Sequence, residues 1–266
     1  ENLAHIFRAF LTDKGVALPD ITYGFYPVLC SLLNMGHKTV PLKEDFSIDI
    51  SDYENIDCPV CIANPNAQTG MYLPPAEIEK LLLQNAGRLV IIDEAYIDFG
   101  GTSCAPLVNK YKNLIVVQTM SKSRSLAGAR VGFAFACKDI IADLESVRAS
   151  FNPYNINRMS MFAAVESLKD KSYFEECTQK FAFVREYTAV NLMELGFKVL
   201  PSRANFLLAS HKSIGGGELY ARLKERGILV RHFSDERIRN FVRVSIGSKE
   251  QMDLFLGAVR AILGEV

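Results

Sequence analysis

Short runs of apolar residues recur through the middle of the chain. Four of them occupy residues 60–63, 89–92, 114–117 and 131–136, and helical or loop stretches separate them. None of these runs alternates apolar with polar positions, as a strand with one face in water would. A run that is apolar throughout is typical of a strand covered by helices on both faces. The pattern therefore predicts a three-layer α/β/α domain with a mostly parallel sheet.

The pattern of apolar and polar residues changes after about residue 150. Long helical stretches follow, with two further strand candidates at residues 205–209 and 241–246. We therefore predict two domains, a large α/β domain over residues 1–150 and a smaller α+β domain over residues 151–266.

Two motifs in the second half favour structural explanations. Ser248 and Gln251 form a capping-box pattern, and the apolar residues behind them recur on one helical face that packs rather than catalyses. Residues 215–217 are three glycines, but the Gly-Lys-Ser/Thr ending of a phosphate-binding loop does not follow them. For the glycines we predict a flexible turn.

The charge balance narrows the classes of partner. The chain has thirty basic and thirty acidic residues, so no strong electrostatic field attracts nucleic acid or an anionic membrane. Residues 1–8 lack the plan of a signal peptide, and no apolar run approaches the length of a membrane span. The expectation is small-molecule chemistry in the cytoplasm, with neither nucleic acid nor membrane as partner.

The six cysteines are scattered through a chain too large to need disulfides, which suits free thiols in a reducing compartment. Cys58 and Cys61 form a single C-x-x-C motif. It lacks a second C-x-x-C or an H-x-x-H and does not open a helix, so we predict a structural pair rather than a redox or metal site.

Polar residues follow three of the apolar runs. They are Asn64 to Asn66 after the first run, residues 93–96 after the second, and Ser121 and Lys122 after the third. Ligands of open α/β sheets bind at the carboxyl ends of the strands. These residues are therefore the candidates for a site.

Residues 64–70, 93–96 and 121–133 together resemble, in order and spacing, the fold-type I aminotransferases. The sequence of these motifs is most similar to that of the histidinol-phosphate aminotransferases, because residues 121–128 read Ser-Lys-Ser-Arg-Ser-Leu-Ala-Gly and an Arg-Val-Gly stretch follows at residue 130. The resemblance covers essentially the whole chain. It implies the fold of a pyridoxal 5'-phosphate transferase, with that cofactor.

The resemblance gives catalytic roles to Lys122, Asp93 and Tyr96. Lys122 would hold the cofactor as a Schiff base, and we expect it to be desolvated enough for a neutral, nucleophilic amine. Asp93 would pair with the pyridine nitrogen and keep it protonated. Tyr96 would place its hydroxyl beside the phenolic oxygen. Without the motif, Lys122 would be a solvated surface charge and Asp93 a helix cap or strand-end carboxylate.

The same resemblance places further residues around the cofactor. Tyr23 matches the aromatic residue that stacks on the pyridine ring, with core packing as its structural alternative. Ser121 and Arg130 would bind the phosphate, a task suited to a hydroxyl and a bidentate guanidinium. Apart from the motif, Arg130 would be an ordinary rim arginine.

Two arginines near the end of the chain are candidates for binding the substrate. Arg243 interrupts an apolar strand, where an uncompensated charge is costly, so it should have an anionic partner. By resemblance it binds the acid group of the substrate, and Arg231 resembles a second anion-binding arginine. An internal salt bridge is the alternative for each.

The sequence departs from the family pattern at two places. Ala67 stands where the family commonly has an asparagine that touches the phenolic oxygen, and Asn66 is the nearest substitute. The loss of one neutral hydrogen bond costs about 0.5–1.5 kcal/mol. Glu1 matches the acidic end of the family's Gly-Ser-Asp-Glu segment, so phosphate donors that precede it in the family are outside this sequence. We therefore expect weakened cofactor binding and poor turnover.

The mechanism implied by the resemblance transfers an amino group between histidinol phosphate and a 2-oxo acid, with glutamate as the counterpart amine and Lys122 moving the proton. It also implies a homodimer with sites at the subunit interface. Close alternatives are an aromatic aminotransferase or threonine-phosphate decarboxylase. A catalytically silent homologue is a further alternative, whereas a dinucleotide-binding dehydrogenase lacks its Gly-x-Gly-x-x-Gly motif here.

Overall fold

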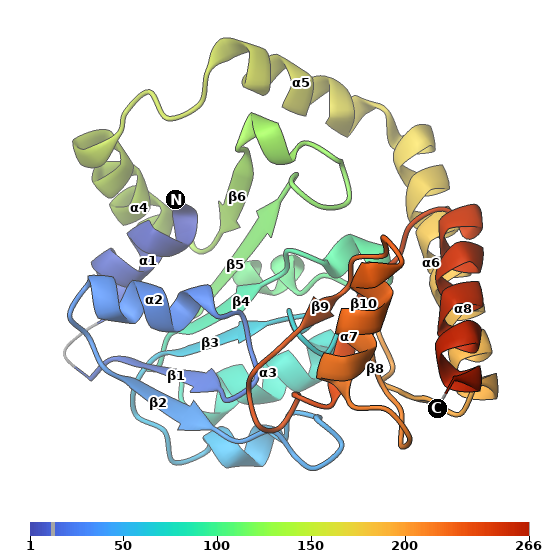
Figure 1. The fold of residues 1–266 in the computed structure, drawn as a ribbon. Coiled ribbons are helices and arrows are strands. Elements are labelled where there is room, and N and C mark those ends of the chain that lie inside the picture. The colour runs from blue at the N-terminus through green and yellow to red at the C-terminus, as the bar shows by residue number, and fades with distance from the viewer. Residues whose placement is uncertain (12–13, 266) are drawn as a thin grey trace.

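The computed structural model describes residues 1–11 and 14–265 and contains two sheets (Figure 1). The larger sheet has six strands in the order β2-β1-β3-β4-β5-β6. All neighbouring strands in it run parallel except β5 and β6, which are antiparallel. The strands are β1 (Val16–Pro19), β2 (His37–Val40), β3 (Val60–Ala63), β4 (Val90–Asp93), β5 (Leu114–Thr119) and β6 (Gly132–Phe135).

Helices cover both faces of this sheet. One face packs against α1 (Asn2–Phe10), α2 (Phe25–Leu32) and α4 (Lys138–Phe151), and the other packs against α3 (Pro75–Gln84). Successive residues of β3 alternate between the two cores, and every residue of β1, β3 and β4 is buried. A strand between two apolar layers needs apolar residues at both alternating positions. The predicted three-layer fold with a mostly parallel sheet is confirmed.

Strand β6 differs from the expectation. Residues 131–136 read as one more strand buried on both faces, but β6 is antiparallel to β5 and lies at the edge of the sheet. Its side chains are half-buried or exposed. The apolar run alone did not distinguish an edge strand from a central one.

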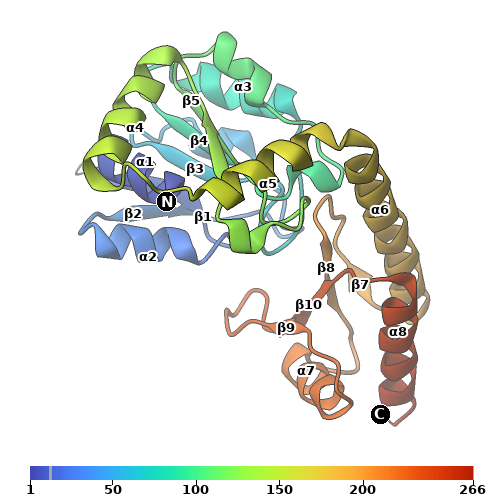
Figure 2. The ribbon, with the colours of Figure 1, turned by 90° about the horizontal axis from the view of Figure 1, so that it is seen from above.

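The second sheet is antiparallel, in the order β7-β8-β10-β9. Its strands are β7 (Lys198–Val199), β8 (Phe206–Ser210), β9 (Arg231–His232) and β10 (Phe241–Ser245). It packs with α6 (Lys171–Glu194), α7 (Gly216–Glu225) and α8 (Lys249–Gly264) around a separate apolar core. Figure 2 shows α5 (Arg158–Lys169) and α6 running from the first sheet to the second. The domain boundary near residue 150 stays a prediction.

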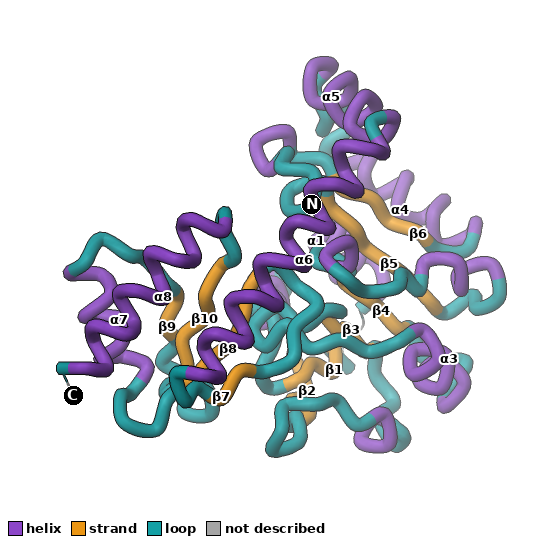
Figure 3. Tube along the Cα trace, turned by 90° about the vertical axis from the view of Figure 1, so that its right-hand side faces the viewer, coloured by secondary structure: helices purple, strands orange, loops and turns teal. Residues whose placement is uncertain are grey.

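Helix α8 has the predicted capping box, with Ser248 and Gln251 bonded reciprocally, and its apolar face is buried in the second core. The three glycines, by contrast, do not form a flexible turn, because Gly215 caps α7 and Gly216 begins that helix. A Cβ at Gly216 would lie 2.7 Å from the carbonyl oxygen of Phe241, so this glycine lets α7 approach β10. The tube in Figure 3 shows α7 beside β9 and β10.

The cysteines are free thiols throughout, and both members of the C-x-x-C motif are buried in the sheet. Burial raises the pKa of the Cys58 and Cys61 thiols, which keeps them protonated and unreactive. Of the helices in the described part of the chain, none is long and apolar enough to cross a bilayer.

Candidate active site

A cavity of about 410 Å³ opens at the carboxyl ends of the parallel strands. Its volume lies within the range of small-molecule sites. Its walls combine backbone and side chains from α1, the ends of β3, β4 and β5, and the loop between β5 and β6. Predicted site residues on its walls are Tyr23, Asp93, Tyr96, Ser121, Lys122 and Arg130.

A larger hollow of about 670 Å³ follows β2 but carries no comparable chemistry. It is an open surface groove, and its Lys43 is already paired with Asp49 and Asp52. The cavity at the strand ends is therefore the candidate site, although it is the smaller of the two.

Asp93 supplies a buried carboxylate to this cavity. It is the last residue of β4, and its Oδ2 accepts a hydrogen bond of 2.7 Å from the hydroxyl of Tyr26, while the Ala95 amide donates to Oδ1 at 3.1 Å. Burial raises the pKa of the Asp93 carboxyl, and both hydrogen bonds together with the charge of Lys122 oppose that rise. A carboxylate held in this way can accept a hydrogen bond from a protonated ring nitrogen.

Lys122 lies in the loop after β5, and β5 is the parallel neighbour of β4, which ends at Asp93. Its Nζ is 5.3 Å from the centroid of the Tyr96 ring, so the predicted lysine and tyrosine are close. The expected desolvation of Lys122 is not observed, because its side chain is exposed in this chain. The hydroxyl of Ser123 donates to Asp98, and this bond anchors the loop next to the lysine.

Ser121 and Arg130 border the cavity on the same side as Lys122. The Ser121 hydroxyl accepts a hydrogen bond of 3.0 Å from Thr119, and the Arg130 guanidinium donates to the Ala127 carbonyl at 2.8 Å. Arg130 has a left-handed backbone with φ of 56° and forms no ion pair within residues 1–11 and 14–265. Its remaining donors can therefore serve an external anion.

Tyr23 presents its ring to the cavity and is 44% exposed, so it is not the packed core residue of the structural alternative. Its ring meets the Tyr26 ring edge-on at 5.5 Å between centroids. Because Tyr26 also bonds to Asp93, the orientation of the exposed ring and that of the buried carboxylate depend on one side chain.

Asn66, the predicted substitute for the missing asparagine, is not among the cavity-lining residues, and other groups already use its amide. Its Nδ2 donates to the Ile21 carbonyl at 2.8 Å, and its Oδ1 accepts from the amides of Gln68 and Thr69. The side chain is buried inside its own turn. Ala67 occupies the wall of the cavity instead.

The two predicted substrate arginines lie beside the cavity rather than on its walls. Arg243 donates to the Ala67 carbonyl at 2.6 Å and to Gln68 Oε1 at 3.2 Å, and its guanidinium lies 4.8 Å from the Phe206 ring centroid. Arg231 lies directly opposite Arg243 in the β9–β10 ladder.

Neither arginine has the internal salt bridge that was the alternative, within the part of the chain described by the structure. Burial lowers the pKa of Arg243, and the nearby charge of Arg231 acts in the same direction. A guanidinium nevertheless stays protonated in proteins, so the pair presents two positive charges.

Two polar neighbours of the site were given no role of their own by the sequence. Tyr26 lies on α2, and only the fold brings it to Asp93. Glu94 is buried, and its carboxylate accepts hydrogen bonds from Ser103, Cys104 and Gln118, of which Gln118 lines the cavity. A strand-end signal existed for Glu94, whereas the contact of Tyr26 has no local signature.

The model of the aminotransferase class I and II family matches residues 1–259. The chain belongs to this family. The histidinol-phosphate aminotransferase of Brachyspira hyodysenteriae is 48% identical over 99% of this chain and 75% of its own length. That of Acinetobacter baumannii is 51% identical over 94% of this chain and 70% of its own length. The predicted resemblance to this branch of the aminotransferase family is confirmed.

Solved structures of the family share the fold. The histidinol-phosphate aminotransferase of Clostridium acetobutylicum superposes with a TM-score of 0.90 at 25% identity, covering 100% of this chain and 82% of that one. The enzyme of Sinorhizobium meliloti, solved in complex with pyridoxal-5'-phosphate, gives 0.85 at 22% identity, over 98% and 74%. The sequence-based expectation of an aminotransferase is confirmed.

Proposed function

We propose that this aminotransferase uses pyridoxal 5'-phosphate to exchange the amino group of histidinol phosphate with a 2-oxo acid, and that Lys122 holds the cofactor. The observation that carries the proposal is the pairing of a buried carboxylate, Asp93, with an amine, Lys122, on neighbouring parallel strand ends around one cavity. Relatives named for this reaction match nearly the whole chain.

The residues around the cavity fit the cofactor. Asp93 would bind the pyridine nitrogen, Tyr23 would stack on the ring, and Tyr96 would lie beside the phenolic oxygen. Ser121 and Arg130 would bind the phosphate, for which Arg130 has unpaired donors. When bound, pyridoxal phosphate supplies an electron sink and a carbonyl that condenses with amines.

The remaining steps depend on side chains of this chain. The Nζ of Lys122, as a free amine, would accept the proton from the substrate carbon that bears the amino group and would later give that proton up again. The ring of Tyr96 lies within reach of this amine, with 5.3 Å between Nζ and the ring centroid. The Tyr26 hydrogen bond favours the ionised form of Asp93, which would hold the proton of the ring nitrogen.

Arg231 and Arg243 suit a substrate that is anionic at the end away from its amine. Two guanidinium groups bind a phosphate or a carboxylate in the same way, which allows histidinol phosphate and glutamate to use one site in turn. Arg243 also contacts the Ala67 carbonyl, so the bound anion lies next to the cavity wall.

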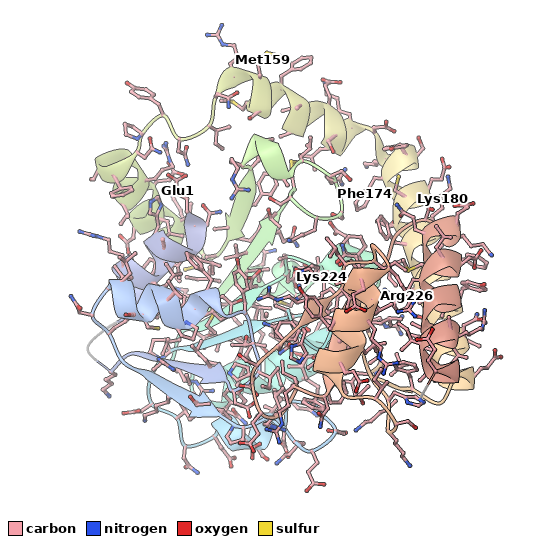
Figure 4. All side chains as sticks on the ribbon, viewed as in Figure 1. Glu1, Met159, Phe174, Lys180, Lys224 and Arg226 are labelled. Carbon is pink, nitrogen blue, oxygen red and sulfur yellow. The ribbon has the colours of Figure 1, made fainter. Side chains whose placement is uncertain are left out.

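We further propose a homodimer. Helix α5 exposes an apolar row that no other part of the described chain covers, and its position at the outer edge is visible in Figure 4 at Met159. The row consists of Met159, Met161, Phe162, Val165 and Leu168. Soluble monomers rarely expose an apolar patch of this kind, whereas subunit interfaces bury one.

The cytoplasm is the compartment we propose for this enzyme. Six cysteines without a single disulfide in the described residues are typical of a reducing environment. Exposure of Cys137 and Cys177 to an oxidising compartment would favour their modification.

An assay of products tests the proposed reaction. The chain, pyridoxal phosphate, histidinol phosphate and 2-oxoglutarate should give glutamate and imidazole acetol phosphate in equal amounts, without carbon dioxide. Release of carbon dioxide from threonine phosphate would instead identify a decarboxylase. If neither substrate lost its amino group or its carboxyl group, the chain would be catalytically silent.

A further inference from the structure

An ion pair joins the two sheets at a distance from the cavity. Arg237, in the loop between β9 and β10, donates through Nη1 to Oδ2 of Asp20, the residue that follows β1. Its Nη2 donates to the backbone carbonyls of Leu42 and Lys43, at 3.0 and 2.9 Å. One guanidinium therefore binds the ends of β1 and β2 together.

The side chain of Asp20 is also held by several hydrogen bonds. Its Oδ1 accepts hydrogen bonds from the amides of Ile21 at 2.8 Å and Leu42 at 3.0 Å. The Asp20 side chain is 18% exposed and that of Arg237 is 32% exposed. Both carboxylate oxygens are used, and the geometry is that of a built junction rather than a loose surface pair.

Apolar packing closes the same junction. The Phe46 ring meets the Phe241 ring edge-on at 5.5 Å, and the Arg237 guanidinium lies 5.3 Å from the centroid of Phe46. The surrounding cluster draws on both sheets and consists of Ile21, Leu42, Phe46, Leu200, Leu208, Ile238 and Phe241. The hairpin of β9 and β10 is thus fixed on the large sheet at one defined place.

The two sides of this junction each carry site residues. Tyr23 lies three residues after Asp20, and the Thr22 carbonyl accepts a hydrogen bond of 3.1 Å from Gln68. Gln68 in turn accepts from Arg243. Movement of Arg237 away from Asp20 would therefore remove the ion pair that ties the loop between the two arginine-bearing strands to the large sheet.

We propose that Asp20 and Arg237 form a positioning pair, which holds Arg231 and Arg243 at the distance from the cavity that an anionic substrate requires. Neither residue is among those that line the cavity. The inference rests on the proposed function, because it presumes that Arg231 and Arg243 bind the substrate anion. It assigns substrate affinity, rather than cofactor affinity, to an ion pair between the sheets.

The variant Arg237→Met tests the pair with the least damage. Asp20 keeps its two backbone donors in this variant, whereas Asp20→Ala would leave the Leu42 amide without that acceptor. Arg226→Met is the matched control, since Arg226 also pairs with a carboxylate, Glu265, and is 31% exposed. Figure 4 shows Arg226 near the end of α7, in the unit around the second sheet.

The readout is the Kd of histidinol phosphate, measured by titration calorimetry with pyridoxamine phosphate present, because this cofactor form has no carbonyl with which the substrate amine can react. We expect Arg237→Met to weaken this binding about tenfold, and Arg226→Met to change it less than about twofold. The Kd of pyridoxal phosphate should stay within about twofold in both. Hydrogen exchange should also accelerate across residues 231–243 in Arg237→Met alone.

Other results would overturn the inference. Equal histidinol-phosphate affinity in Arg237→Met and the parent, with only a lower Tm, would show a merely structural ion pair. The variant Arg243→Gln separates this failure from failure of the proposed function. If Arg243→Gln also left the affinity unchanged, or if the parent bound no histidinol phosphate, the assignment of the arginines itself would be wrong.

Discussion

Arg231 on β9 and Arg243 on β10 are directly opposed partners in an antiparallel ladder, so both guanidinium groups lie on the same face of the second sheet. Like charges opposite each other destabilise a sheet. Across the described residues neither has a carboxylate partner, and the Nε of Arg243 is buried without a hydrogen-bond acceptor. An external anion would relieve this repulsion.

The first prediction follows from that repulsion. Arg243→Gln should lower kcat/KM for histidinol phosphate about 100-fold, because a charged, desolvated contact to the anion is lost. The same variant should raise the Tm of the substrate-free chain, since the cross-strand repulsion disappears. Steady-state kinetics and thermal unfolding give the two values. Loss of stability together with unchanged kinetics would show that Arg243 has only a structural role.

The buried carboxyl of Asp93 should make the free energy of unfolding depend on pH. Its burial raises the pKa in the folded chain, so the folded state binds more protons than the unfolded state between the two pKa values. The free energy of unfolding therefore falls as pH rises through that interval and stays lower above it. Asp93→Asn should remove this loss and raise the Tm at pH 7, by about 2–4 °C for each kcal/mol recovered.

The control for Asp93→Asn is the same comparison in acid. Below about pH 3, where the carboxyl is protonated in both states, parent and variant should unfold at similar temperatures. A difference in Tm that did not vary with pH would contradict the account. Cofactor affinity should fall in the variant although its stability rises, as is usual for a functional group held at a cost to stability.

Tyr26→Phe isolates the hydrogen bond that the sequence did not reveal. The hydroxyl of Tyr26 stabilises the ionised form of Asp93, so its removal should raise the Asp93 pKa further. We expect about tenfold weaker binding of pyridoxal phosphate at pH 7, consistent with the roughly 1.5–3 kcal/mol of a hydrogen bond to a charged group. The affinity should recover toward higher pH. An affinity equal to that of the parent at every pH would exclude this role.

The sequence predicted some strands of the large sheet and not others. Residues 60–63 became β3 as predicted, because a strand buried on both faces leaves an unmistakable apolar run. Strands β1 and β2 were not predicted. The side chains of β2 are mostly exposed, so its position depends on pairing with β1 rather than on apolar character.

The site shows the same division. Asp93, Tyr96 and Lys122 lie at or just after the carboxyl ends of two neighbouring parallel strands. The apolar pattern of each strand was therefore enough to predict that these residues share one site. Tyr26 lies 67 residues from Asp93, and Arg237 lies 217 residues from Asp20, and such contacts depend on tertiary packing. The surroundings of Asn66 were not predicted either, because its Oδ1 accepts from amides of its own turn and its Nδ2 donates to the distant Ile21 carbonyl.

The apolar row on α5 predicts a dimer that one substitution can dissociate. Phe162 is 64% exposed, so Phe162→Glu should leave the fold of the subunit intact while raising the dimer dissociation constant at least about 100-fold. Sedimentation velocity measures this change directly. Leu254→Glu on α8 exposes a similar charge elsewhere and should leave the dimer unchanged. A parent chain that sediments as a monomer would refute the proposed interface.

Lys122 is the residue on which the proposed chemistry depends most. The decisive measurement is the visible spectrum of the purified chain with pyridoxal phosphate, beside that of Lys122→Ala. We expect an absorption band of a lysine-bound cofactor in the parent and none in the variant, and glutamate or histidinol phosphate should bleach the parent's band. The same spectrum in both proteins, or no band in the parent, would contradict the claim that Lys122 holds the cofactor in this cavity.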